Sequence, residues 1–229
     1  MAKLIKYMML FVCVNSFAQK TYTFDYYTVY EIDNSNSKQY IIGNSNDSSY
    51  FTYIFAYNDV FSSMSLYDTK NDLQYDFDIK KRNINSVKSF TDIADSYMIY
   101  KYGFSEREKF FKDIFEIEYD PLNDEETIIV IKKYKNKRKK KLVYTNVFHV
   151  KDYSITKNQF YITNLIFGFS FDINKIKTTG VVIEQNVMFK KTPNENYTKT
   201  LTDIGQLDFS LNLEIEPVIT RTKTIIQIR

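Results

Sequence analysis

Pairs of acidic residues two positions apart are the first candidates for chemistry in this sequence. Three pairs occur, in separate segments of the chain: Asp76 and Asp78, Glu116 and Glu118, Glu214 and Glu216. Two carboxylates on one face of a strand lie roughly 7 Å apart, which fits neither of the separations used by glycosidases cleanly, although side chains can adjust. A repeated pattern of this kind is more typical of the wet face of a sheet. A hydrolase with paired acids is therefore only the third hypothesis for function.

Other catalytic chemistries need residues that this chain lacks. His149 is the only histidine and Cys13 the only cysteine, so a zinc site built from His and Cys alone is excluded. A serine triad would need His149, but Gly168–Asp172 (GFSFD) lacks the second glycine of the nucleophile motif. The acidic turn at 120–126 lacks the spacing of a calcium loop, and there is no glycine-rich phosphate loop. We therefore predict a protein that is not an enzyme, with no catalytic residue, metal site or cofactor.

A basic run, Lys132–Lys141 (KKYKNKRKKK), is the strongest charge feature of the chain. It lies between two strand-like segments, Thr127–Ile131 and Leu142–Tyr144, so the simplest structure is a hairpin with a basic tip. A basic tip keeps a sheet soluble and discourages edge pairing, and we favour this interpretation. The alternative is contact with anionic lipid head groups or polysaccharide. The contact residues would then be Lys135, Lys137, Arg138, Lys139 and Lys140.

Alternating aromatic residues predict the elements that carry these side chains. The chain holds 20 Tyr and 19 Phe but only five Gly and three Pro, and aromatic residues favour strands. Apolar and polar residues alternate in four long segments: Tyr22–Ile32, Phe51–Tyr57, Leu73–Ile79 and Leu207–Glu216. A period of two predicts strands with one wet face. In the first segment, the predicted apolar face consists of Tyr22, Phe24, Tyr26, Tyr30 and Ile32.

Short polar turns separate these segments and suggest how the strands are joined. Turn-forming residues cluster at 33–37, 44–48, 69–72, 120–124 and 192–196. Strands joined in this way predict an all-β, mainly antiparallel fold with roughly ten strands, arranged as a single curved meander sheet, an open barrel or a sandwich. At most one short helix is expected, at the capping-box pattern Ser105–Glu108.

The first 18 residues read as an export signal. Lys3 and Lys6 precede a short apolar stretch, Met8–Val14, and Ser16–Ala18 supplies small residues for cleavage. We expect cleavage after Ala18, which leaves a single β-rich domain at 19–229 without cysteine and without a transmembrane span. A lipoprotein anchored at Cys13 is the alternative, although bulky Phe11 and Val12 precede that cysteine. Removal of two lysines nearly balances the 31 basic and 28 acidic residues, so nucleic acid is not an expected partner.

The N-terminal region also carries a resemblance to a known group of proteins. Ser16–Lys20 (SFAQK), followed at once by the aromatic segment Tyr22–Tyr26 (YTFDY), is similar to the start of many uncharacterised secreted β-rich proteins of flavobacteria and their relatives. The chain resembles the GLPGLI group among these in style, without the short motif that gives that group its name. The resemblance implies a periplasmic, outer-membrane-associated or extracellular β protein, and it implies no catalytic residues.

These observations lead to two main hypotheses for function. The favoured one is an exported envelope protein that binds an apolar or lipid-like ligand in a curved, aromatic-lined sheet, because the apolar inventory exceeds what one thin sheet needs. The alternative is an interaction or surface-assembly module that contacts another envelope protein through exposed tyrosines and loops. The sequence predicts no particular ligand, partner or oligomeric state.

Overall fold

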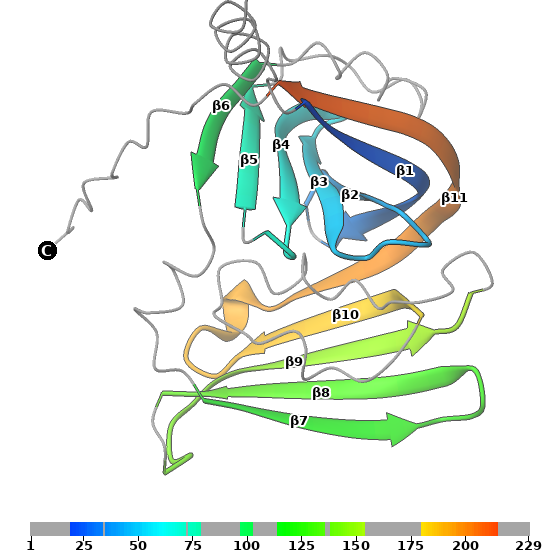
Figure 1. Ribbon diagram of the computed structural model, residues 1–229. Coiled ribbons are helices and arrows are strands. Elements are labelled where there is room, and N and C mark those ends of the chain that lie inside the picture. The colour runs from blue at the N-terminus through cyan, green and yellow to red at the C-terminus, as the bar shows by residue number, and fades with distance from the viewer. Residues whose placement is uncertain are drawn as a thin grey trace, which may run out of the picture.

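The computed structural model describes residues 19–33, 35–71, 73–78, 97–102, 114–135, 138–153 and 180–214. They form eleven strands of one antiparallel sheet (Figure 1): β1 Gln19–Ile32, β2 Ser37–Gly43, β3 Tyr50–Tyr57, β4 Val60–Asp68, β5 Leu73–Asp78, β6 Tyr97–Tyr102, β7 Ile114–Pro121, β8 Glu126–Tyr134, β9 Leu142–Lys151, β10 Val181–Phe189 and β11 Tyr197–Glu214. The one helical element among the described residues is a 3-10 turn at Pro193–Glu195. The predicted all-β, antiparallel class is confirmed.

The strand order divides the sheet into two meanders that meet in its middle. It runs β6-β5-β4-β3-β2-β1-β11-β10-β9-β8-β7, so β1–β6 form a first half and β7–β11 a second half. Strands β1 and β11 join the halves through an antiparallel pairing from Gln19↔Glu214 to Ile32↔Lys199. Strands β6 and β7, neighbours in sequence, lie at opposite edges, and the sheet is therefore not closed into a barrel.

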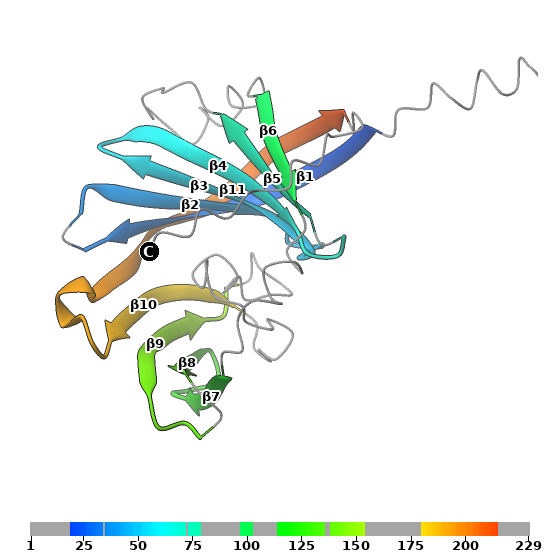
Figure 2. The ribbon, with the colours of Figure 1, turned by 90° about the vertical axis from the view of Figure 1, so that its left-hand side faces the viewer.

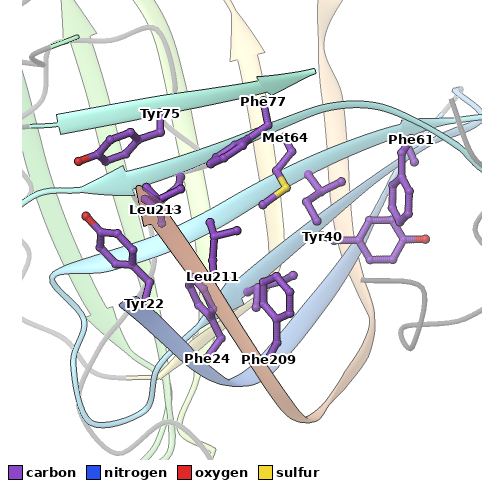
Figure 3. Close-up of a cluster of buried hydrophobic side chains, with 14 of the residues drawn as sticks. Tyr22, Phe24, Tyr40, Phe61, Met64, Tyr75, Phe77, Phe209, Leu211 and Leu213 are labelled. Atoms are coloured by element: carbon purple, nitrogen blue, oxygen red, sulfur yellow. The ribbon is translucent and has the colours of Figure 1, made fainter. Parts of the chain in front are cut away.

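The first half, together with the C-terminal part of β11, rolls around one core. A flat sheet would place β1 and β5, four positions apart in the strand order, roughly 19 Å apart. Instead, the rings of Tyr22 on β1 and Tyr75 on β5 lie 6.3 Å apart between centroids, and Lys20 on β1 forms an ion pair with Asp68 at the end of β4. The side chains inside this roll form the first core (Figure 3): Tyr22, Phe24, Val29, Tyr40, Ile42, Ile54, Ala56, Phe61, Met64, Leu66, Tyr75, Phe77, Phe209, Leu211 and Leu213.

A second core joins the two halves. It lies on the face of β1 and β2 that is opposite to the first core. Its buried members come from β1, β2, β8, β9 and β10: Tyr30, Ile41, Ile129, Ile131, Phe148, Val150 and Val182. In Figure 2, β7–β10 lie below the strands of the first half, and β11 runs from the lower strands to the upper ones. Packing between the halves thus buries the outer face of the rolled first half.

One detail of the predicted alternation, the common apolar face of β1, is wrong. Tyr22 and Phe24 lie in the first core while Tyr30 lies in the second, because register shifts between Phe24 and Tyr26 and between Val29 and Tyr30 interrupt the period of two. In β2 both faces are buried, since Tyr40 and Ile42 belong to the first core and Ile41 to the second. A strand covered on both faces loses the alternation between polar and apolar residues.

Several sequence predictions concern residues that the structure does not describe. The export signal at 1–18, Cys13, the helix start at Ser105, the segment Gly168–Asp172 and Glu216 all lie outside the described residues. Among the residues that are described, no helix is both long and apolar enough to cross a membrane.

Candidate ligand site

Three members of the acidic pairs have described side chains, Asp76, Glu116 and Glu118, and each of them forms hydrogen bonds with neighbouring side chains. Lys139 Nζ donates to Glu116 Oε1 at 2.8 Å, and Lys132 Nζ donates to Glu118 Oε1 at 2.6 Å. Hydrogen bonds from Lys139 and Tyr134 lower the pKa of Glu116. Asp76 accepts hydrogen bonds at 2.7 Å from Ser65 and Gln74. A general acid needs a raised pKa, and the shift of the Glu116 pKa has the opposite direction.

His149 lies on the surface of β9 within a small charged cluster. Its Nε2 is 2.9 Å from Glu126 Oε2, while Lys151 Nζ donates to the other oxygen of Glu126, also at 2.9 Å. Hydrogen bonds from Lys151 and His149 lower the pKa of Glu126. The arrangement ties the β8 and β9 ends together across a pairing of Glu126 with Lys151. No group of three His, Cys, Asp or Glu side chains that could hold a metal occurs among the described residues.

The basic run forms the predicted hairpin between β8 and β9. Lys132 and Lys133 belong to β8 itself, and Lys135 N donates to Lys141 O at 2.9 Å to close the connection. Lys135, Arg138, Lys139 and Lys140 are exposed, and Lys137 lies outside the described residues. Among these exposed side chains, Lys139 forms an ion pair with Glu116 at 2.8 Å.

A group of polar side chains that sequence reasoning missed lies on the face of the second core, and four of them are buried: Gln39, Asn146, Gln185 and Lys199. We call it the polar tier, and its members are Gln39 (β2), Tyr53 (β3), Asn146 (β9), Gln185 (β10), and Tyr197 and Lys199 (β11). Side chains directly opposite each other in neighbouring strands share a face. Gln185 is opposite both Lys199 and Phe148, and Phe148 is a member of the second core. The polar tier therefore continues the second core rather than forming a separate surface.

Contacts within the polar tier connect the two halves of the sheet. Gln185 Nε2 donates to Asn146 Oδ1 at 3.0 Å. Lys199 Nζ lies 5.4 Å from the ring centroid of Tyr197. Burial raises the pKa of Tyr53, and the nearby phenol of Tyr197 raises it further, whereas a hydrogen bond with Gln39 acts in the opposite direction. Side chains from β3 of the first half and β11 of the second thus approach each other across this face.

Lys199 is the chemically unusual member of the tier. Only 5% of its surface is exposed, yet no described carboxylate forms an ion pair with its ammonium group. Burial alone lowers the pKa of Lys199 to about 7, because removal from water disfavours the charged form. A buried lysine without a counter-charge is an energetic cost that the fold bears, and perturbed groups of this kind concentrate at functional sites.

The sequence contains a weak signal for this site. Lys199 occupies the place of an apolar residue in the alternation Tyr197, Lys199, Leu201. The signal is hard to recognise because the two ends of β11 face different cores. A register shift in the pairing with β1, between Val29 and Tyr30, separates the stretch around Lys199 from Phe209, which faces the first core. Asn146 and Gln185 carry the same kind of signal, since Asn146 stands between Tyr144 and Phe148 in the alternation of β9, and Gln185 between Ile183 and Val187 in that of β10.

Comparison with protein-family models, with curated proteins and with solved structures found no significant match for this chain. The class of protein is therefore defined by its fold and site: an open antiparallel sheet with two cores, and a buried, cation-bearing polar tier beside the second core.

Proposed function

We propose that this chain is a non-enzymatic, exported envelope protein that binds an apolar or lipid-like ligand between the two halves of its curved sheet. The observation that carries this proposal is the second core. Its members come from both halves, and it passes directly into the polar tier. A buried layer that is apolar at one end and polar at the other suits a molecule with a tail and a head group.

The first core supports the proposal by contrast. Its aromatic rings pack closely against one another: the centroid distance is 5.1 Å for Tyr22 with Tyr50, 5.6 Å for Phe24 with Tyr50 and 5.5 Å for Phe24 with Phe209. Rings at these separations fill the roll with specific edge-to-face and stacked contacts. The simplest role of the first core is therefore stability, which leaves the face between the halves as the place for a ligand.

The proposed location follows from the sequence. Residues 1–18 have the pattern of an export signal, and the resemblance to secreted flavobacterial proteins agrees with it. Periplasmic, outer-membrane-associated and extracellular locations all place the protein where lipids and lipid-bearing proteins are available as ligands.

Native mass spectrometry of the protein purified from its own envelope tests the proposal. A bound lipid of defined mass is the expected result. A stoichiometric protein partner without lipid would instead support the interaction-module hypothesis. The binding face can be tested separately with the neutral fluorescent probe N-phenylnaphthylamine.

Adjacent residues on opposite faces of β2 provide a matched pair of variants for that probe. Ile41 belongs to the second core and Ile42 to the first, and both are almost fully buried. Ile41→Ala should weaken probe binding severalfold, whereas Ile42→Ala should lower stability and leave probe affinity unchanged. Weaker binding in Ile42→Ala alone, or no binding by the wild type, would contradict the proposal.

A further inference from the structure

The second core and the polar tier together indicate which kind of head group the ligand carries. Along one row of the sheet, Lys199 on β11 is opposite Gln185 on β10, which is opposite Phe148 on β9, which is opposite Ile129 on β8. The row therefore changes from a cation through an amide to two fully apolar side chains. A molecule lying along it would place one end beside an ammonium group and its other end against hydrocarbon.

Two members of the polar tier have unused hydrogen-bonding capacity among the described residues. Lys199 offers three N–H donors and forms no ion pair with a described residue. Gln39 Oε1 is a buried acceptor without a hydrogen-bond partner in the part of the chain that the structure describes. Most buried polar atoms in proteins are paired, so unpaired ones at one site suggest a missing ligand.

The surroundings of the Lys199 ammonium group differ from those of Lys133, the other buried lysine on the same face among the described residues. Lys133 on β8 lies between two aromatic rings, with its Nζ 5.9 Å from the centroid of Phe115 and 5.7 Å from that of Tyr144. Two rings stabilise the Lys133 ammonium through cation–π attraction, whereas one ring, that of Tyr197, lies beside Lys199. Lys133 therefore serves as a control with the same charge and similar burial.

We propose that Lys199 binds the anionic head group of the ligand and that the ligand is a long-chain carboxylic acid, with its carboxylate beside Lys199 and its chain against the second core. This inference rests on the proposed function, because it assumes a ligand between the halves. A carboxylate would supply the counter-charge that Lys199 lacks, and it would accept charge-assisted hydrogen bonds from the ammonium group.

Dodecanoate and dodecanol test this proposal, since they share one chain length and differ in the charge of the head group. Their affinities are measured by displacement of N-phenylnaphthylamine from the wild type, from Lys199→Met and from Lys133→Met. We expect the wild type and Lys133→Met to prefer dodecanoate by roughly tenfold or more. In Lys199→Met this preference should disappear while the affinity for dodecanol persists.

The outcomes separate the two proposals. Equal affinity of the wild type for dodecanoate and dodecanol would overturn the role of Lys199 and leave the proposed function standing, and this measurement requires no variant. Equal loss of the preference in Lys133→Met would also overturn the assignment, since it would point to a general effect of positive charge. If the wild type binds neither molecule and does not bind the probe, the proposed function fails and the inference fails with it.

Discussion

At the scale of single residues, Lys199 and Asp68 show how differently this fold treats buried charge. Asp68 is buried and fully engaged: it accepts hydrogen bonds from Lys20, from Tyr22 at 2.8 Å, and from the backbone N–H of Asn71 at 3.0 Å. Lys199 is equally buried and lacks a counter-charge among the described residues. The first charge stabilises the fold and the second costs stability.

Replacing Asp68 should therefore be destabilising. Asp68→Asn keeps the shape but removes the charge that Lys20 and Tyr22 recognise, and we expect a loss of about 2–3 kcal/mol in the free energy of unfolding at neutral pH. Chemical denaturation measures this loss. Asp208→Asn, at an exposed position on β11, is the control and should be neutral.

The effect of Asp68→Asn should depend on pH in a defined direction. Burial raises the pKa of Asp68, but hydrogen bonds from Lys20, Tyr22 and Asn71 outweigh it and lower the pKa below its usual value. A carboxylate with a lowered folded-state pKa contributes stability above its unfolded pKa, and this is lost as the pH falls through the folded value. The difference between wild type and variant should accordingly shrink below about pH 4. A stability difference between wild type and Asp68→Asn that stays constant down to pH 2 would contradict this prediction.

Replacing Lys199 should raise the stability of the fold at neutral pH, whereas replacing Asp68 should lower it. Because the pKa of Lys199 is lowered to about 7, the unfolded chain carries a proton there that the folded chain lacks between about pH 7 and 10. Wild-type stability should therefore rise relative to Lys199→Met by about 1.4 kcal/mol per pH unit in this range. Denaturation of both proteins from pH 7 to 9.5 measures the difference. Lys199→Met should be the more stable at pH 7, and a less stable variant would show that Lys199 has a partner.

At the scale of elements, two glycines allow tyrosines of β1 to lie over the neighbouring strands. A Cβ atom at Gly43 would lie 2.9 Å from Cε1 of Tyr26, and one at Gly205 would lie 2.7 Å from the hydroxyl of Tyr27. Tyr26 is fully buried and cannot move aside, whereas Tyr27 is only partly buried. We expect Gly43→Ala to cost about 1–3 kcal/mol of stability and Gly205→Ala clearly less. Equal costs in thermal unfolding would contradict this explanation.

The basic hairpin between β8 and β9 is expected to act as a soluble tip. Changing Lys135, Arg138, Lys139 and Lys140 to Gln should leave the melting temperature nearly unchanged, because exposed charges contribute little. Binding to vesicles that contain anionic lipid should also be unchanged. A steep loss of vesicle binding, reproduced in wild type by added salt, would instead assign these residues to an anionic surface.

Most elements of this fold could be predicted from the sequence, whereas the candidate site could not. The alternation in Leu207–Leu213 and Leu73–Phe77 predicted faces that the first core confirms. It failed along β1, where the register shifts depend on pairing with β11, about 180 residues away in the chain. The polar tier also depends on pairing between segments distant in the sequence, since Gln39, Gln185 and Lys199 come to lie on one face only when the two halves pair.

At the scale of the whole molecule, the pairing of β1 with β11 makes one sheet from two meanders and leaves two cores on opposite faces. The first core closes the roll of β1–β6, and the second holds β7–β10 against that roll. An open sheet of this kind can exchange contacts between its halves for contacts with a ligand while the roll stays intact. The proposed ligand site and the first core would then lie on different faces of the same strands.

Methyl NMR of the full mature protein during titration with dodecanoate tests this division most directly. Ile, Leu and Val methyl groups occur in both cores, and Ile41 and Ile42 report on opposite faces of one strand. We predict saturable shift changes at the methyl groups of the second core, namely Ile41, Ile129, Ile131, Val150 and Val182. Those of the first core, among them Ile42, Ile54, Leu66 and Leu211, should stay in place. Changes concentrated in the first core, or no saturable change in either, would contradict a ligand site between the halves.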